Sequence, residues 1–165
     1  MYSDLTSNPR IRPVEAAHIG DLIRIAEETN LSPWTAQNYL DEIKNPSAIM
    51  LRLVGEDNTT MGFVVGRTVI GGDIETQLDA EIYNIAIDIT QQGNGYGQIL
   101  LTGFVKICSA RQVQKLWLEV RESNRKAISF YEKNGFTTVQ TRNNFYSDPR
   151  EAALLMRLVL APAQE

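Results

Sequence analysis

The sequence predicts a mixed α/β domain in which a central sheet of about six to seven strands is flanked by four helices. Two apolar segments joined by a short polar turn indicate an antiparallel hairpin before the middle of the chain. A strand, a helix and a second strand follow, and this order requires a parallel pair. Two further strand-like segments come last, so we expect a mixed sheet and one domain spanning residues 1–165.

The first part of the chain predicts one short strand and two helices. The strand is expected at residues 11–16, and apolar residues at helical spacing then predict a helix over residues 17–28. A second helix should end near Lys44, with either Ser32 or Thr35 as its N-terminal cap.

The middle of the chain predicts the hairpin, the centre of the sheet and a third helix. Residues 48–54 and 60–70 are the hairpin strands, separated by the turn segment GEDNT. Residues 81–88 are almost wholly apolar, which suits a strand buried on both faces. A glycine-rich loop follows, and an apolar stripe from Ile99 to Cys108 predicts a helix that packs on the sheet.

The last part predicts a strand, a fourth helix and two closing strands. Residues 115–120 alternate between apolar and other residues, which places Glu119 opposite the apolar face. Residues 123–135 combine a Ser-Asn cap, apolar residues at helical spacing and a glycine stop. Residues 136–142 and 151–160 are the closing strands, joined by the loop segment NNFYSDP.

Composition argues against several classes of protein. The formal net charge of -4 would repel a phosphate backbone, so direct nucleic-acid binding is not expected. Cys108 is the only cysteine, which excludes an internal disulfide and a cysteine-rich zinc site and fits a reducing compartment. No run of about 18 apolar residues suggests a membrane segment. We therefore expect a cytoplasmic protein.

The loop segment QGNGYG, residues 92–97, places three glycines between a strand and a helix. Amides at a helix start have no helical partner and lie at the positive end of the helix dipole, so the loop suits a diphosphate. A flexible turn is the simpler alternative. A P-loop is excluded because no Gly-Lys-Ser/Thr sequence follows. A dinucleotide site would use Glu119 for a ribose, but the glycine spacing does not fit that fingerprint.

The same loop matches the pattern Q/R-x-x-G-x-G/A, and the chain resembles the GNAT superfamily of N-acetyltransferases along nearly its whole length. The segments YNIAID, LWLEVRESN, AISFYEKNGF, RNNFY and LLMRL are similar, in this order, to ribosomal-protein-alanine N-acetyltransferases of the RimI type. The resemblance implies a GNAT fold and acetyl-CoA as cosubstrate, without a metal. It also implies a protein or peptide N-terminus as acceptor, with a ribosomal protein as one candidate.

The resemblance implies a role for each site residue. Glu119 corresponds to the acid proposed as general base, and Tyr131 to the tyrosine proposed to protonate the leaving thiolate. Trp34 and Tyr146 match residues that shape the acceptor site, Tyr146 in the loop between the last two strands. The other matches bind coenzyme A through the backbone of the central strand, the loop amides and one asparagine: Ile85, Ala86, Ile87, Gly93, Asn94, Gly95, Tyr96, Gly97, Gln98 and Asn124.

The chemistry of the side chains suits these roles. An amine must be neutral to attack a thioester, so a carboxylate such as Glu119, acting through a water, can serve as base. The leaving thiolate has a pKa near that of cysteine, about 8.5, and a phenol with a pKa of about 10 can give it a proton. Without the resemblance, Tyr131 and Trp34 would be interpreted as core residues, Glu119 as a paired or solvated acid and Asn124 as a helix cap.

Three positions depart from the family pattern. Gly93 and Asn94 stand where relatives often have basic residues, so phosphate binding would depend on the amides and on Arg125 or Lys126. Asn143 replaces a frequent arginine in the acceptor loop. Two alternatives to N-terminal acetylation therefore stay open. One is acetylation of a lysine side chain or a small amine, and the other is a noncatalytic coenzyme-binding module.

Overall fold

The computed structural model describes residues 10–71 and 77–160, which form one seven-stranded sheet in the order β1-β2-β3-β4-β5-β7-β6. The strands are β1 (Ile11–Pro13), β2 (Ala48–Val54), β3 (Thr60–Ile70), β4 (Leu78–Ile87), β5 (Lys115–Arg121), β6 (Thr137–Ser147) and β7 (Arg150–Val159). The α-helices are α1 (Ile19–Glu28), α2 (Ala36–Lys44), α3 (Tyr96–Ala110) and α4 (Arg125–Lys133), with 3-10 helices η2 (Ala16–His18) and η3 (Ile89–Gln91). The predicted mixed α/β class is confirmed.

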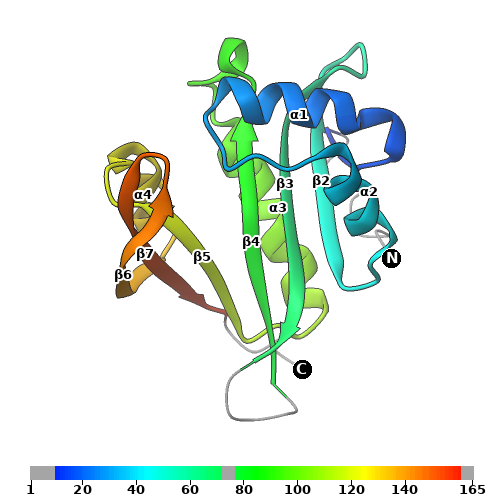
Figure 1. Ribbon diagram of the computed structural model, residues 1–165. Coiled ribbons are helices and arrows are strands. Elements are labelled where there is room, and N and C mark those ends of the chain that lie inside the picture. The colour runs from blue at the N-terminus through cyan, green and yellow to red at the C-terminus, as the bar shows by residue number, and fades with distance from the viewer. Residues whose placement is uncertain (1–9, 72–76, 161–165) are drawn as a thin grey trace.

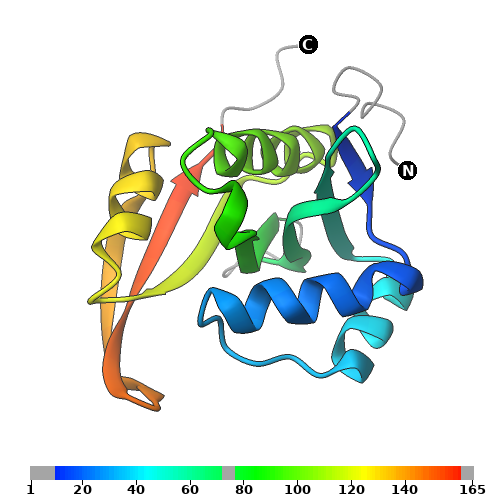
Figure 2. The ribbon, with the colours of Figure 1, turned by 90° about the horizontal axis from the view of Figure 1, so that it is seen from above.

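The helices cover the two faces of the sheet. Helices α1 and α2 lie on one face and α3 lies on the other, which is clear when the sheet is seen along its strands (Figures 1 and 2). One apolar cluster joins α1 and α2 to the inner strands, and a second joins α3 and α4 to the opposite face. Within the described residues, no helix is long and apolar enough to cross a membrane.

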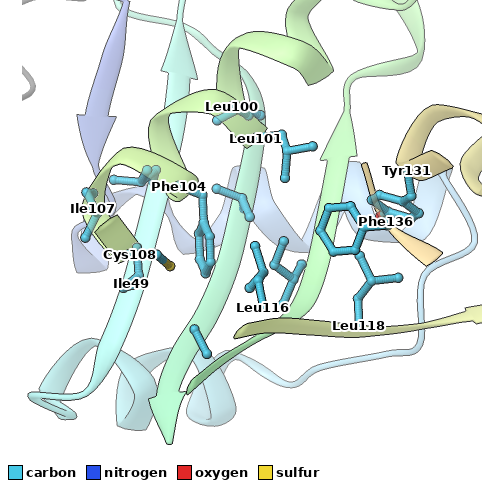
Figure 3. Packing of buried hydrophobic residues seen from close by; sticks show 14 of the residues in the cluster. Ile49, Leu100, Leu101, Phe104, Ile107, Cys108, Leu116, Leu118, Tyr131 and Phe136 are labelled. Carbon is cyan, nitrogen blue, oxygen red and sulfur yellow. The ribbon is translucent and has the colours of Figure 1, made fainter. Parts of the chain in front are cut away.

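The cluster under α3 fixes the helix that follows the glycine loop. Phe104 points from α3 toward the sheet, on the face where Leu116 and Leu118 of β5 also lie (Figure 3). These three side chains and Leu100 are buried. Burying a side chain of this size stabilises the fold by about 1.5 to 3 kcal/mol. The start of α3 is therefore held firmly against the sheet by residues one to three turns further along the helix.

Strands β4 and β5 are the only parallel pair among the described strands, and they pair over a short length. Their register runs from Ala80 opposite Leu116 to Ile82 opposite Leu118. Beyond these residues the strands diverge (Figure 1). A bulge in β4 leaves Tyr83 as an extra residue, because the register with β3 shifts between Val65 and Gly66. The sheet is therefore split from its middle to one end.

The N-terminal elements differ from the prediction in their bounds. Strand β1 covers only Ile11–Pro13, and η2 precedes α1, which begins at Ile19. Of the two predicted caps for α2, Thr35 is correct: its hydroxyl accepts a hydrogen bond from the Asn38 amide at 3.1 Å. Ser32 lies three residues before this cap and does not start the helix.

The C-terminal hairpin is longer than predicted, so Tyr146 lies in a strand and not in the predicted loop. Strand β6 continues to Ser147, so most of the predicted loop is strand. The pairing resumes after a bulge, with Tyr146 opposite Glu151 and Ser147 opposite Arg150. Polar residues in NNFYSDP suggested a loop, but an exposed edge strand carries polar residues equally well.

Candidate active site

The turn after β4 is built by Asp88 and two left-handed glycines. The Asp88 carboxylate accepts a hydrogen bond from the Thr90 amide at 2.9 Å and so caps η3. Gly93 and Gly95 have φ angles of 82° and 75°, which other residues adopt only with strain. Gly95 is the N-terminal cap of α3. The chain thereby turns from the strand into the helix through two positions that have no side chain.

The first turn of α3 presents free amides at the end of the split in the sheet. The amide of Ile99 is the first to close a helical hydrogen bond, to the Gly95 carbonyl at 3.4 Å. The amides of Tyr96, Gly97 and Gln98 precede it and have no partner within the helix. Together with the dipole of a 15-residue helix, they form an anion site.

A cavity of about 610 Å³ runs along β4, the glycine loop and α4. It contains every predicted coenzyme-binding residue except Asn94, whose side-chain amide instead donates to the Gln91 carbonyl at 3.0 Å and stabilises the turn. Tyr131 also lines it. The predicted residues that line it are Ile85, Ala86, Ile87, Gly93, Gly95, Tyr96, Gly97, Gln98 and Asn124.

The shape and charge of this cavity fit an elongated ligand with an anionic group. A Cβ atom at Gly97 would enter the space between Phe130 and Ile87, 3.7 Å from the first and 4.0 Å from the second. Lys126 contributes a positive charge to the wall, whereas Arg125, the other predicted cation, does not line it. Asn124 caps α4 as predicted, accepting from the Ala127 amide at 3.2 Å.

Helix α1 forms a wall of this cavity that the sequence did not reveal. Glu28, Thr29 and Leu31, at and after its C-terminal end, line the cavity. An ion pair of 2.9 Å between Arg24 and Asp88 ties the helix to the turn after β4. Burial alone would raise the pKa of Asp88, but the hydrogen bonds from Thr90 and Arg24 lower it overall. Arg24 and Asp88 are far apart in the chain, and a single sequence contains no pattern that would predict their ion pair.

A second, smaller cavity of about 220 Å³ lies on the face of the sheet that α1 and α2 cover. Two carboxylates and four aromatic rings dominate its wall. It is lined by Ser32, Glu81, Ile82, Tyr83, Trp117, Leu118, Glu119, Phe145, Tyr146 and Leu155. The predicted residues Glu119 and Tyr146 are both among them, and Glu81, Tyr83 and Phe145 were not predicted.

Glu119 projects from β5 into the smaller cavity and is bound by Arg142. The Arg142 guanidinium donates to the Glu119 carboxylate at 2.8 Å, reaching over β7 from β6. The pKa of Glu119 is raised, because burial outweighs the opposing effect of Arg142, and the negative charge of Glu81 raises it further. A carboxylate with a raised pKa is a better proton acceptor than an exposed one.

Tyr131 is a buried residue of the larger cavity that interacts electrostatically with Tyr146 of the smaller one. Its side chain is 7% exposed and packs between Phe130 and Phe136, with ring centroids at 5.4 and 5.5 Å. Burial raises its pKa, and Tyr146 raises it further. The phenol is therefore protonated at neutral pH. Tyr131 lines the larger cavity and Tyr146 lines the smaller one, and the two phenols are near enough to interact electrostatically.

Trp34 is not among the residues that line the smaller cavity, but it packs against one of them. Its ring packs on Tyr39 and Tyr83, with centroids at 5.2 and 5.9 Å. Tyr83 reaches the cavity from β4, on the same side of the strand as Glu81. Trp34 thus supports the wall. On the facing strand, Trp117 is fixed by a hydrogen bond of 2.9 Å from its indole nitrogen to Asp79.

Comparisons with known proteins agree with this geometry. Residues 19–136 match the acetyltransferase (GNAT) family. A ribosomal protein bS18-alanine N-acetyltransferase from Haemophilus influenzae is 37% identical over 153 residues, which are 91% of this chain and 98% of that protein.

Solved structures match over nearly the same length. The crystal structure of the ribosomal-protein-S18-alanine N-acetyltransferase from Escherichia coli has a TM-score of 0.80 at 29% identity, covering 94% of this chain and 96% of that one. Arabidopsis thaliana NAA60 in complex with acetyl-CoA has a TM-score of 0.82 at 17% identity, covering 91% and 97%. The second likeness shows the shared fold.

Proposed function

Because the chain belongs to the acetyltransferase (GNAT) family, we propose that it transfers the acetyl group of acetyl-CoA to the α-amine of a protein N-terminus. One observation carries this proposal: Tyr131 of the larger cavity interacts electrostatically with Tyr146 of the smaller one, which in turn interacts with Glu119 of the smaller cavity. A donor in the larger cavity and an acceptor in the smaller one can therefore reach each other through the sheet.

The larger cavity holds the coenzyme. The amides of Tyr96, Gly97 and Gln98 bind the diphosphate at the positive end of α3, and Lys126 adds a positive charge. The backbone of Ile85, Ala86 and Ile87 pairs with β3 on one side and lies beyond the pairing with β5 on the other. Polar groups on the side facing away from β3 can therefore bind the pantetheine arm, apart from the Ile87 carbonyl, which accepts from Gln92. Acetyl-CoA supplies an acyl group that is already activated, so no protein nucleophile is required.

Glu119 and Tyr131 move the protons. Glu119 accepts the proton of the acceptor ammonium, through a water, and leaves a neutral amine that can attack. Tyr131, kept protonated by burial, donates to the sulfur that leaves. Arg142 holds the carboxylate in place and stabilises its ionised form. Positioning of the two reactants supplies much of the rate.

An α-amine suits this site better than a lysine side chain. Its pKa is about 7.7 to 8.0 against about 10.4 for lysine, so removing its proton at pH 7 costs less by roughly 3.5 kcal/mol. One base with a raised pKa meets the smaller demand. An N-terminal alanine of a ribosomal protein is a candidate acceptor, because a bacterial relative at 37% identity carries that substrate in its name.

Two further expectations belong to this proposal. We propose that residues 1–165 work as one domain, because a single sheet runs through the described part of the chain. We also propose a cytoplasmic location, which the buried, unpaired thiol of Cys108 and an acceptor made on ribosomes both support.

The test compares two peptides of the same composition. One has a free N-terminal alanine, and the other has a blocked N-terminus and an internal lysine. We expect faster acetylation of the free alanine peptide, followed by mass spectrometry with acetyl-CoA as donor. Equal or faster reaction of the blocked lysine peptide would refute N-terminal acetylation and favour a lysine acetyltransferase. Binding of acetyl-CoA without turnover of either peptide would favour a noncatalytic module.

A further inference from the structure

The ring of Tyr146 in the smaller cavity lies against a guanidinium that the proposed reaction does not use. Arg121 ends β5, and its guanidinium carbon lies 4.1 Å from the centroid of the Tyr146 ring. Because β7 separates β5 from β6, the Arg121 side chain reaches across the start of β7 to make this contact. A cation over an aromatic face at this distance is attracted to it, so Arg121 holds the ring in one orientation.

Arg121 is held in turn by the beginning of β7 and the turn before it. Its guanidinium donates to the backbone carbonyls of Asp148 and Pro149, at 3.4 and 3.2 Å, and to the Glu151 carboxylate at 3.3 Å. The planar guanidinium has its donors in a fixed arrangement, so several acceptors determine both its position and its orientation. A lysine in its place could pair with Glu151 but would lack this fixed plane.

Glu151 connects this arginine to the beginning of α4. One of its carboxylate oxygens accepts from Arg121, and the other accepts from the backbone amide of Ser123 at 2.6 Å. Ser123 directly precedes Asn124, which caps α4 and lines the larger cavity. The hydrogen bond from Ser123, with a further contribution from Arg121, lowers the pKa of Glu151, so its carboxylate is ionised at neutral pH. One carboxylate therefore joins the start of the coenzyme helix to the support of Tyr146.

We propose that Arg121 and Glu151 are positioning residues of the reaction, which hold Tyr146 in the wall of the smaller cavity and fix its place relative to α4. The inference rests on the proposed function, in which the smaller cavity receives the acceptor. Tyr146 interacts electrostatically with Tyr131 and Glu119, so a displaced ring changes the surroundings of both proton-transfer groups. A displacement of about 1 Å at a reacting site can lower the rate by about 100-fold. Neither Arg121 nor Glu151 lines either of these two cavities, so both act through Tyr146.

Kinetics tests whether Arg121 acts through Tyr146. Arg121→Gln should lower kcat/KM for a peptide with a free N-terminal alanine by about tenfold, and Arg121→Lys should not restore it. In the background Tyr146→Ala, Arg121→Gln should cause little further loss, because the ring on which Arg121 acts is already gone. Arg150→Gln, which changes an exposed arginine of the same hairpin, should behave like the wild type. A loss of the same size in both backgrounds would overturn the proposal.

Two changes at Glu151 separate its two contacts. Glu151→Gln keeps an oxygen for the Ser123 amide but loses the charge that binds Arg121, so it should raise KM for the peptide and leave the affinity for CoA unchanged in calorimetry. Glu151→Ala loses both contacts and should weaken CoA binding as well, because the beginning of α4 is no longer held. Glu122→Gln, which changes an exposed acid beside Ser123, should alter neither quantity. Wild-type values of both quantities in folded Glu151→Gln and Glu151→Ala would contradict the role of Glu151.

Fluorine NMR provides a measurement that does not depend on turnover. With fluorotyrosine in place of tyrosine, the resonance of Tyr146 is identified by its loss in Tyr146→Phe. Glu151→Gln, which leaves Arg121 and the ring in the chain, should shift and broaden this resonance, whereas that of Tyr39, buried under α2, should stay. An unmoved Tyr146 resonance would overturn the proposal. If the wild type acetylates no peptide, the proposed function fails, while the resonance still decides whether Glu151 positions the ring.

Discussion

Removing Arg142 should shift the pH dependence of the enzyme in a direction that the site geometry fixes. The guanidinium of Arg142 donates to the carboxylate of Glu119 and stabilises its ionised form. In the variant Arg142→Gln this positive charge is lost, so the pKa of Glu119 rises above its already raised value. The base is then protonated over a wider range of acidic pH, and the acidic limb of kcat/KM moves to higher pH.

The distance and exposure of the pair set the size of the shift. At 2.8 Å and an effective dielectric constant of about 40 to 80, the Coulomb energy is about 1.5 to 3 kcal/mol. Arg142 is 45% exposed and Glu119 is 27% exposed, so screening and side-chain entropy reduce the net value to about 0.7 to 1.4 kcal/mol. This corresponds to a rise of about half to one unit in the pKa of Glu119.

The assay is kcat/KM for a peptide with a free N-terminal alanine, measured from about pH 5 to about pH 9. The acceptor amine also titrates in this range, but its contribution is the same for every variant, so only the difference between profiles is interpreted. Arg12→Gln is a matched control, because Arg12 is an exposed arginine in β1, at the opposite edge of the sheet. Coincident profiles for Arg142→Gln and the wild type would refute Glu119 as the titrating base.

Two further predictions test the coenzyme side of the site. Tyr131→Phe should keep the fold and the affinity for CoA but lower kcat by about 100-fold or more, because only the proton donor is lost; wild-type kcat in single-turnover experiments would return Tyr131 to a packing role. Gly97→Ala should weaken CoA binding by calorimetry, since the methyl group enters the cavity beside Phe130, whereas Gly20→Ala, in open space on α1, should not. Equal affinity in both glycine variants would argue against amide binding at this loop.

The parts of the fold that a single sequence predicts are those with local patterns. The apolar run at 81–88 indicated the central strand, and the stripe from Ile99 to Cys108 indicated the helix above it, because both follow from the spacing of apolar residues. The ends of strands and helices could be predicted less well where polar residues lie in regular structure. Strand β6 is exposed along nearly its whole length, so no alternation marks where it ends.

The residues of the candidate site likewise fall into those that a single sequence predicts and those that it does not. The glycine loop was visible in the sequence because its function requires particular residues at consecutive positions. Glu81, Arg142 and Arg24 were not visible, because their importance comes from neighbours that are distant in the chain: Glu81 opposite Trp117 of β5, Arg142 over β7, and Arg24 beside Asp88. The bulge at Tyr83 is likewise a property of pairing with β3.

The order of the strands determines when the site is completed during synthesis. Strand β7 lies between β5 and β6 in the sheet, and β6 pairs with β7 alone among the described strands. Tyr146 and Arg142 therefore cannot take their places beside Glu119 until the last strand has left the ribosome. The coenzyme cavity uses elements up to α4 and can form earlier. A nascent chain that stops before β7 would carry a donor site with no acceptor site.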